Sequence, residues 1–196
     1  MANEIILCAG AIHSPAILLR AGIGPVGHLH DMGIDVRAKR PGVGQNLMEH
    51  AAAAISAWTK PHARLNQITR RHTHLGWRYS SNMHDAPPGD MFGIAVDKSA
   101  WHAVGDQLGS MLTWVNKTYS TGQLTLRTND WRNEPIVEFN MLSDVRDLDR
   151  LVVGYKKLAE LFLSETISSV TKDPFPSAYS ERVRKIGTVT TKNKVL

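Results

Sequence analysis

Residues 4–25 read Glu-Ile-Ile-Leu-Cys-Ala-Gly-Ala-Ile-His-Ser-Pro-Ala-Ile-Leu-Leu-Arg-Ala-Gly-Ile-Gly-Pro. The apolar run at residues 5–8 is typical of a strand that is buried on both faces. The small residues that follow it would let another backbone or a ligand approach the end of that strand. Ser14 followed by Pro15 predicts a helix N-cap and the first helical turn. A strand, a turn of small residues and a helix together indicate a nucleotide-binding α/β domain.

Two motifs in this region resemble signatures of the glucose–methanol–choline (GMC) family of FAD-dependent oxidoreductases. The first covers residues 10–24, where Ala21 replaces a usual serine. The second is Pro-Gly-Val-Gly-Gln-Asn-Leu-Met-Glu-His at residues 41–50, where Glu49 replaces a usual aspartate. Residues 120–147 resemble part of the family's substrate domain. The resemblance extends over residues 3–165 and is loose between residues 51 and 106.

This resemblance implies an α+β fold. We expect an antiparallel sheet with packed helices, the substrate domain, preceded by the last strand and helices of an α/β FAD-binding domain. By this division, residues 1–50 are the C-terminal part of the FAD-binding domain and residues 51–165 are part of the substrate-binding domain. Residues 166–196 are expected to form a basic, poorly structured tail.

The resemblance also implies the reaction, which is oxidation of an alcohol CH–OH group to a carbonyl with hydride transfer to FAD. Choline dehydrogenases and alcohol oxidases are both compatible with it. The residues expected to bind the cofactor lie in the two motifs; they are Ala9, Gly10, Ala11, Ser14, Asn46, Leu47 and His50. No catalytic residue is assigned, because neither His13 nor His50 matches the family's catalytic histidine.

The family's glycine-rich phosphate-binding unit and its catalytic histidine segment have no match in this sequence. We therefore expect an internal fragment of such an enzyme, inactive alone and without bound FAD, whose parent oxidises a small-molecule alcohol. A non-catalytic folded module that serves as a scaffold or interaction domain is the alternative. The apolar run at residues 5–8 would leave an exposed edge and favour self-association.

Composition narrows the class of protein. The net charge of +5 is matched by five basic residues between positions 182 and 194, where no acidic residue occurs. This pattern favours a solvated tail over a nucleic-acid-binding surface. Cys8 is the only cysteine, which excludes an intramolecular disulfide and favours a cytoplasmic setting. No apolar run has the length of about 20 residues that a membrane span needs.

Two further motifs carry no prediction of a site. Residues 22–27 match G-x-G-x-x-G, but a helix is expected before them, and no acidic residue follows at positions 40–46. The pairs His28/His30 and His72/His74 have a spacing of two, which points helical side chains to different sides. No metal site is therefore predicted.

The remaining pattern predicts helices at residues 25–32 and 70–81 and strands at residues 34–39, 51–59, 91–96, 109–116, 123–127 and 135–139. The clearest helix begins at Asp144. Its apolar stripe consists of Leu148, Leu151, Val152, Tyr155, Leu158, Ala159 and Phe162. We expect this stripe to pack on an antiparallel sheet formed by the strands at residues 91–96, 109–116 and 123–127.

Overall fold

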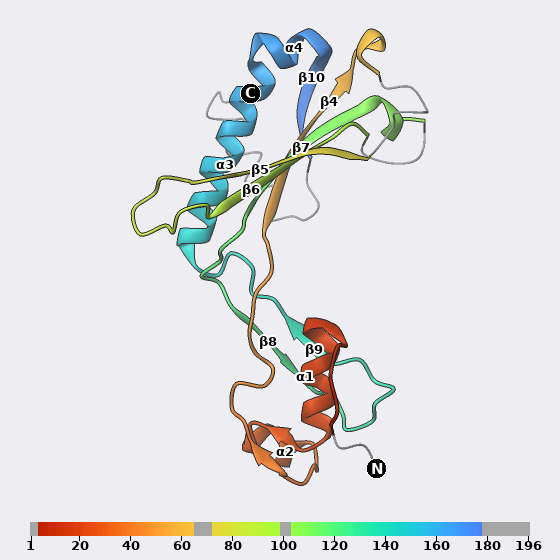
Figure 1. Ribbon diagram of the computed structural model, residues 1–196, viewed down its shortest axis with the longest axis vertical. Coiled ribbons are helices and arrows are strands. Elements are labelled where there is room, and N and C mark those ends of the chain that lie inside the picture. Colours follow the sequence, from red (N-terminus) through yellow and green to blue (C-terminus); the bar gives the residue numbers. More distant parts are fainter. Residues whose placement is uncertain (1–3, 65–71, 99–102, 178–196) are drawn as a thin grey trace. The chain divides into compact units, whose positions relative to one another are not determined.

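The structure is a computed structural model that describes residues 4–64, 72–98 and 103–177. The chain forms two compact units, one of residues 1–49 and 120–143 and the other of residues 50–119 and 144–196. The chain first passes from one unit to the other between residues 49 and 50. Residues 120–143 were expected in the substrate domain but belong to the first unit, because they form strands beside its N-terminal part. Figure 1 colours both units by position along the sequence.

The first unit combines two helices with short strands. Its elements are α1 (Gly10–Arg20), β1 (Ile23–Gly24), α2 (Val26–Asp31), β2 (Ala38–Lys39), β3 (Gln45–Leu47), β8 (Gly122–Thr125) and β9 (Ile136–Glu138). Strands β1 and β2 pair in parallel, whereas β3, β8 and β9 form an antiparallel sheet in that order. The predicted helix at 25–32 and edge strand at 135–139 are confirmed. The strand predicted at 34–39 is reduced to β2.

The core of the first unit is small and apolar. It consists of Ala16, Leu19, Leu29, Leu124 and Leu126, each at most 2% exposed. These residues come from α1, α2, β8 and the residue that follows β8, so they join the N-terminal segment to residues 120–143. His28 contributes a polar link, because its Nε2 accepts a hydrogen bond of 2.9 Å from the backbone N–H of Leu126.

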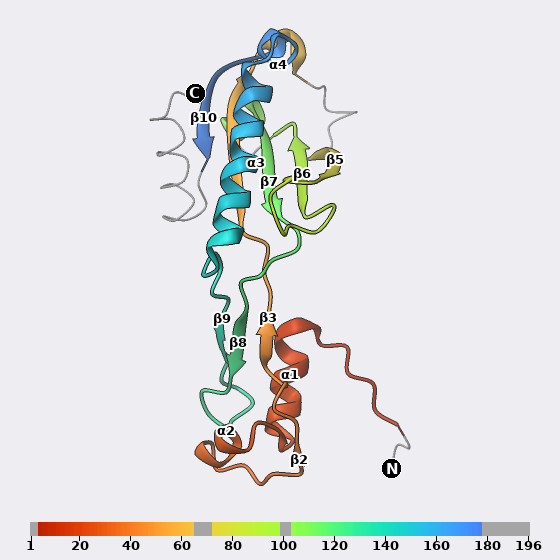
Figure 2. The ribbon, with the colours of Figure 1, turned by 90° about the vertical axis from the view of Figure 1, so that its left-hand side faces the viewer.

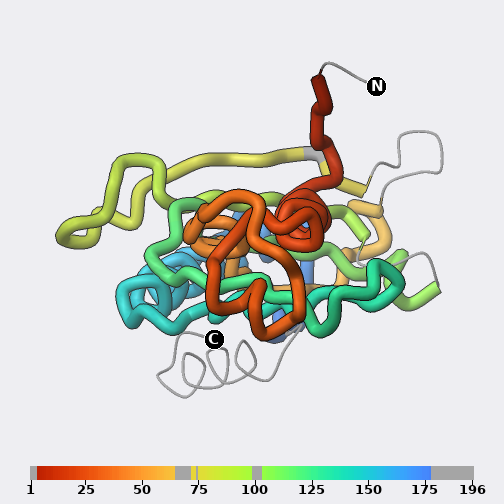
Figure 3. Tube along the Cα trace, turned by 90° about the horizontal axis from the view of Figure 1, so that it is seen from below, coloured from red at the N-terminus to blue at the C-terminus, as the bar shows by residue number. Residues whose placement is uncertain are grey.

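The N-terminal segment differs from the sequence-based expectation. Residues 5–8 form no strand, and Ile5 and Ile6 are 80% and 78% exposed. A strand needs hydrogen-bonding neighbours, and none of the strands in the described ranges pairs with this run. Figure 3 shows the segment leaving α1 at its first turn. Helix α1 also begins earlier than predicted, with Ala9 at its N-cap and Ser14 in its second turn.

The match to G-x-G-x-x-G has a structural explanation. Gly22 follows α1 and has a φ of +80°, and a Cβ at this position would collide with the backbone oxygen of Asp35. Its own carbonyl oxygen accepts hydrogen bonds from the N–H groups of Arg37 and Ala38, at 2.8 and 3.1 Å. Glycine is therefore needed here for the close approach of two chain segments.

The second unit is a five-stranded antiparallel sheet with a long helix. Its elements are β4 (Ala52–Thr59), η1 (Pro61–Ala63), β5 (Thr73–Tyr79), β6 (Met91–Val96), η2 (Gly105–Gln107), β7 (Leu108–Val115), α3 (Val145–Leu163), α4 (Glu165–Val170) and β10 (Thr171–Ser177). The strand order is β10-β4-β7-β6-β5. The strands predicted at 51–59, 91–96 and 109–116 are confirmed, and together with α3 they establish the α+β fold class.

Helix α3 packs along the sheet as its apolar stripe predicted (Figure 2). Asp144 caps the helix by accepting a hydrogen bond from the N–H of Arg146, and Leu151, Tyr155 and Leu158 are at most 2% exposed. The expected set of strands was partly wrong. The strand predicted at 123–127 is β8 of the first unit, and β4 occupies its place beside β7.

Two predictions in the second unit are wrong. Residues 70–81 were predicted as a helix, but β5 pairs with β6 over residues 73–79, where Thr73, Trp77 and Tyr79 are typical strand formers. Part of the expected tail is ordered, because α4 and β10 extend to Ser177. Strand β10 contains two prolines, which are tolerated because it lies at the sheet edge with an irregular register. Residues 178–196 lie outside the described residues.

Candidate functional site

A pocket in the first unit contains several of the predicted cofactor residues. Its volume is about 420 Å³, and it lies between the first turns of α1, the glycine-rich loop with β3, and β8. Its lining residues are Ala11, Ser14, Pro15, Leu18, Gly42, Val43, Gly44, Gln45, Asn46, Leu47, Met48 and Leu124. This lining includes no charged side chain, so recognition of a ligand depends on backbone groups, hydroxyl and amide side chains, and small apolar surfaces.

The start of α1 supplies polar groups to this pocket. The first turn of the helix contains no acidic residue, so no carboxylate of that turn offsets the positive end of the helix dipole. Ser14 Oγ accepts a hydrogen bond of 3.0 Å from the N–H of Ala9 and keeps its own O–H for donation. Pro15 lacks an N–H, so the Ala11 carbonyl receives no ordinary helical hydrogen bond from it. Gly10 has no heavy atom within 4 Å of the position that a Cβ would take.

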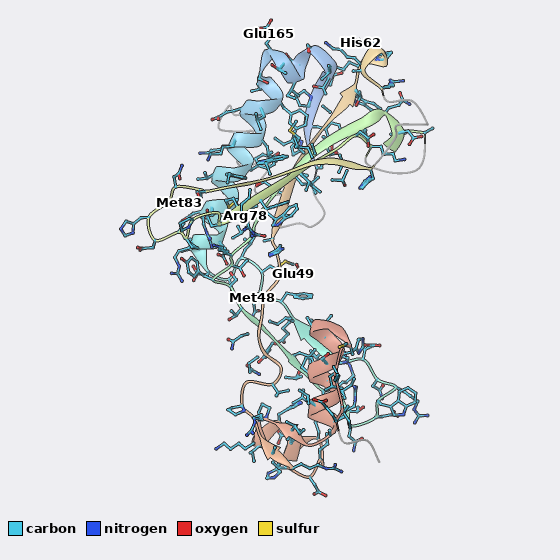
Figure 4. The ribbon with its side chains drawn as sticks, in the orientation of Figure 1. Met48, Glu49, His62, Arg78, Met83 and Glu165 are labelled. Atoms are coloured by element: carbon cyan, nitrogen blue, oxygen red, sulfur yellow. The ribbon has the colours of Figure 1, made fainter. Side chains whose placement is uncertain are left out.

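The loop at residues 41–47 forms the opposite wall. Gly44 has a φ of +82°, and a Cβ at this position would collide with the backbone oxygen of Leu124. The Gly44 oxygen in turn accepts a hydrogen bond of 2.6 Å from the N–H of Leu124, which ties the loop to β8. Asn46 has a φ of 57°, a left-handed conformation that asparagine tolerates better than most residues. Met48, labelled in Figure 4, follows β3 and is 60% exposed.

The structure brings four of the seven predicted residues together, because Ala11, Ser14, Asn46 and Leu47 line this one pocket. Ala9 and Gly10 lie at the adjacent helix start. His50 does not line the pocket. It is the first residue of the second unit, and its ring is stacked on that of Trp114 with centroids 6.4 Å apart. Whether these residues contact a cofactor stays a prediction.

Sequence reasoning missed most of the apolar lining. The sequence placed Leu18 in a helix and Leu124 in a strand, but it did not indicate that their side chains line a pocket. Val43 was assigned only to a loop. The alternation of polar and apolar residues at positions 123–127 was the available sequence signal for Leu124. The pocket depends on β8 lying beside β3, and these strands are separated by more than seventy residues of sequence.

No acid–base centre is assigned among the described residues of the first unit. His13 lies 3.7 Å from Glu134, and both side chains are more than half exposed. His28 is engaged with the backbone of Leu126. In the described parts of the chain, no group of three histidine, cysteine, aspartate or glutamate residues could hold a metal ion. None of the helices described is long and apolar enough to cross a membrane.

Comparison with known proteins identifies the family. Two family models, both described as GMC oxidoreductase, match residues 1–52 and 118–192. The chain belongs to the GMC oxidoreductase family. A relative, 5-(hydroxymethyl)furfural oxidase from Methylovorus sp. (strain MP688), is 44% identical to this GMC chain over 172 residues. That match covers 85% of the chain but only 31% of the relative. The GMC chain thus spans about a third of the length of such a relative.

Solved structures of GMC-type folds agree with the architecture. Pyridoxine 4-oxidase from Mesorbium loti matches 95% of this chain with a TM-score of 0.75 and 20% identity, and the match covers 38% of that structure. A formate oxidase variant from Aspergillus oryzae RIB40, in a study of FAD modification, matches 91% of this chain with a TM-score of 0.72 and 17% identity. The match covers 41% of that structure. At these identities, the comparison establishes the fold.

Proposed function

We propose that this chain supplies part of the FAD-binding and substrate-binding regions of an oxidoreductase that converts an alcohol CH–OH group to a carbonyl. The observation that carries the proposal is the pocket between the start of α1, the 41–47 loop and β8. Its position at two motifs of an FAD-dependent family, and the FAD named for the formate oxidase, support the choice of cofactor.

The residues of the pocket fit part of a flavin cofactor. Small residues at Gly10 and Ala11 allow a planar or extended group to approach the helix backbone. The N-terminal N–H groups of α1 and the dipole of the helix stabilise negative charge on a ligand. The Ser14 hydroxyl and the Asn46 side chain add directional hydrogen bonds. When bound, FAD supplies the hydride acceptor for alcohol oxidation.

Most of the work assigned to this chain is binding and orientation. Leu18 and Leu124 add apolar surface to the lining of the pocket. We assign no residue of the chain to proton abstraction from the alcohol. We therefore propose that residues 1–196 alone are inactive and hold no stoichiometric FAD, and that a longer polypeptide carries the activity.

The experiment compares two variants of the longest native polypeptide that contains this sequence. Ala11→Leu fills the pocket with a side chain of similar helix propensity, whereas Ile17→Leu changes an exposed residue of α1 outside the lining. We expect Ala11→Leu to raise the Kd for FAD by about tenfold or more, a loss of about 1.4 kcal/mol. Ile17→Leu should leave it unchanged. Equal flavin absorbance per protein in both variants would exclude this pocket as the FAD site.

The same preparation tests the substrate class. 5-(Hydroxymethyl)furfural is the first alcohol to assay, because the relative with that name is 44% identical over most of this chain. We expect alcohol-dependent reduction of a dye acceptor by the longer polypeptide and none by residues 1–196. Turnover of an alcohol by residues 1–196 with stoichiometric FAD would contradict the proposal. A longer polypeptide that binds neither flavin nor alcohol would favour the non-catalytic module.

Self-association is the remaining proposal about partners. Three consecutive apolar residues of the first unit, Ile5, Ile6 and Leu7, are exposed to solvent. We propose that this segment pairs with a second copy when the chain is alone in solution. Sedimentation of the chain and of an Ile5→Lys/Ile6→Lys variant tests this. If the unsubstituted 196-residue chain is monomeric at high concentration, the proposal is wrong.

A further inference from the structure

A buried cluster of charged residues lies at one end of the second unit. Asp90, Asp147 and Arg150 are each at most 1% exposed. The Arg150 guanidinium lies between the two carboxylates, with Nη1 3.3 Å from Asp90 Oδ2 and Nη2 bonded to Asp147 Oδ1. We call Asp90, Tyr119, Asp147 and Arg150 the Arg150 cluster. The function proposed above does not use it.

Members of the cluster also form hydrogen bonds with the segment after β7 and with the loop between β5 and β6. Asp147 accepts hydrogen bonds of 3.0 and 3.1 Å from the N–H of Tyr119. Arg150 donates a hydrogen bond of 2.9 Å to the Lys117 oxygen. Asp90 accepts from the N–H and the hydroxyl of Ser81, both at 2.8 Å. The cluster thus joins the start of α3, the segment after β7 and the loop between β5 and β6.

The Tyr119 ring covers the charged groups. The guanidinium carbon of Arg146 lies 3.7 Å from the ring centroid, and that of Arg150 lies 4.8 Å from it. The Tyr119 hydroxyl donates a hydrogen bond of 2.6 Å to the backbone oxygen of Asp85. Cation–aromatic contacts of this kind strengthen when the cation is shielded from water, as Arg150 is.

The place of the cluster in the chain gives it a role. We call each point where the chain passes from one unit to the other a crossing. The chain leaves the second unit after Tyr119 and returns to it at Asp144, so the cluster lies at both of these crossings. The remaining crossing, at residues 49 and 50, reaches the same end, because the N–H of Val115 donates to the Ala51 oxygen at 3.2 Å. The three crossings are therefore neighbours within the second unit.

We propose that the Arg150 cluster is a conformational clamp that holds residues 116–119 and 144–147 together, so that the directions of two crossings are set within the second unit. The clamp opens as a local cooperative element, separately from the ladder between β4 and β7. Arg150 and Tyr119 are its positioning residues. They act on the backbone of the crossings.

Hydrogen exchange of the full 196-residue chain tests the clamp. Tyr119→Leu removes the ring from both guanidinium groups without leaving a buried charge unpaired. Tyr119→Phe keeps the ring and removes only the hydroxyl bond to Asp85. Lys157→Met removes a cation 5.0 Å from the Tyr79 ring elsewhere in the same unit and serves as the control.

We expect Tyr119→Leu to accelerate amide exchange at residues 116–119 and at the first turn of α3 by about tenfold or more. The β4–β7 ladder should change by less than about twofold, and Tyr119→Phe and Lys157→Met should have little effect at the crossings. Two outcomes overturn the proposal. Unchanged exchange at the crossings would show that the ring holds nothing, and equal acceleration throughout the unit, or its unfolding, would make the cluster an ordinary part of the core.

Discussion

Different interactions stabilise each of the two units of this chain. The second unit has strands of six to eight residues in its central ladder, a helix of 19 residues along the sheet, and a buried cluster of charges. The first unit has strands of two to four residues and a core of five buried apolar side chains. It also exposes Ile5 and Ile6 almost fully.

This difference indicates where stability is concentrated. Long antiparallel ladders satisfy many backbone groups within one sheet, whereas two-residue strands contribute few such bonds. A small apolar core supplies little free energy of folding beyond the entropy that ordering costs. We therefore expect the second unit to unfold at higher urea concentration than the first. The predictions below test this ranking.

The largest effect is expected at Arg150. Replacing it by methionine leaves Asp90 and Asp147 buried without their cation, and breaking a buried ion pair in this way costs about 3–5 kcal/mol. Urea unfolding followed by tryptophan fluorescence reports mainly on the second unit, which contains Trp58, Trp77 and Trp114, whereas Trp131 of the first unit is 78% exposed when folded. Arg146→Met is the matched control, because the Arg146 side chain is 53% exposed. Equal loss of stability in both variants would contradict the importance of the buried charges.

A core truncation tests the first unit. Leu19 is fully buried between α1 and its neighbours, so Leu19→Ala should cost about 2–5 kcal/mol. We expect this loss to exceed the total stability of the small unit and to unfold it. Amide exchange resolved by residue should then rise in α1 and β8 and stay unchanged in β4 and β7. Ile17→Ala, at a 42% exposed position on the same helix, is the control. Unfolding of both units together would show that they form one cooperative structure.

Two tyrosines of the second unit differ in whether the hydroxyl group forms a hydrogen bond. The Tyr79 hydroxyl is hydrogen-bonded to Thr113 Oγ1 at 2.6 Å, so Tyr79→Phe should cost about 1 kcal/mol. The Tyr155 hydroxyl is buried without a hydrogen-bond partner among the described residues, and burial raises the pKa of Tyr155 to about 12. Tyr155→Phe should therefore be neutral or stabilising. A larger loss for Tyr155→Phe than for Tyr79→Phe in urea unfolding would reverse this assignment.

The smallest effect concerns a motif that both units contain. The motif is Asp130-Trp-Arg132 in the first unit and Asp144-Val-Arg146 in the second. In both, the guanidinium group and the backbone N–H of the arginine donate hydrogen bonds to the aspartate carboxylate. The hydrogen bond from Arg146 lowers the pKa of Asp144 to about 2, and that from Arg132 lowers the pKa of Asp130. Because both folded-state pKa values are depressed, their stabilisation is present above pH 4 and is lost as pH falls through the lowered values.

Carboxyl chemical shifts measured from pH 5 to pH 1.5 give both titrations. We expect Arg146→Met to raise the midpoint of Asp144 towards its ordinary value of 3.8 and to leave Asp130 unchanged. Arg132→Met should do the reverse. If the first unit unfolds at a pH above the lowered pKa of Asp130, Asp130 will titrate at its ordinary pKa, while the pKa of Asp144 will stay lowered. An unshifted Asp144 in the folded chain would contradict the pairing.

Local pattern was sufficient for a large part of the fold and some of the site. The apolar stripe after Asp144 predicted α3 and its buried face, because a helical repeat of 3.6 residues places those side chains on one side. Short apolar segments predicted β4, β6 and β7, and the alternation of residues 123–127 predicted β8. The two motifs indicated residues at the start of α1 and in the 41–47 loop, and four of them line one pocket.

Tertiary structure decided what local pattern could not. Residues 73–79 have the i, i+4 spacing of a helix, but pairing with β6 made them a strand, since backbone hydrogen bonds to a neighbour outweigh a weak local preference. Residues 5–8 have the composition of a buried strand, yet they are exposed because no described strand lies beside them. The assignment of β8 to the first unit, the pocket wall at Leu124 and the Arg150 cluster all join residues that are distant in sequence. Such contacts depend on how the whole chain packs, and a local sequence pattern contains no information about the partner.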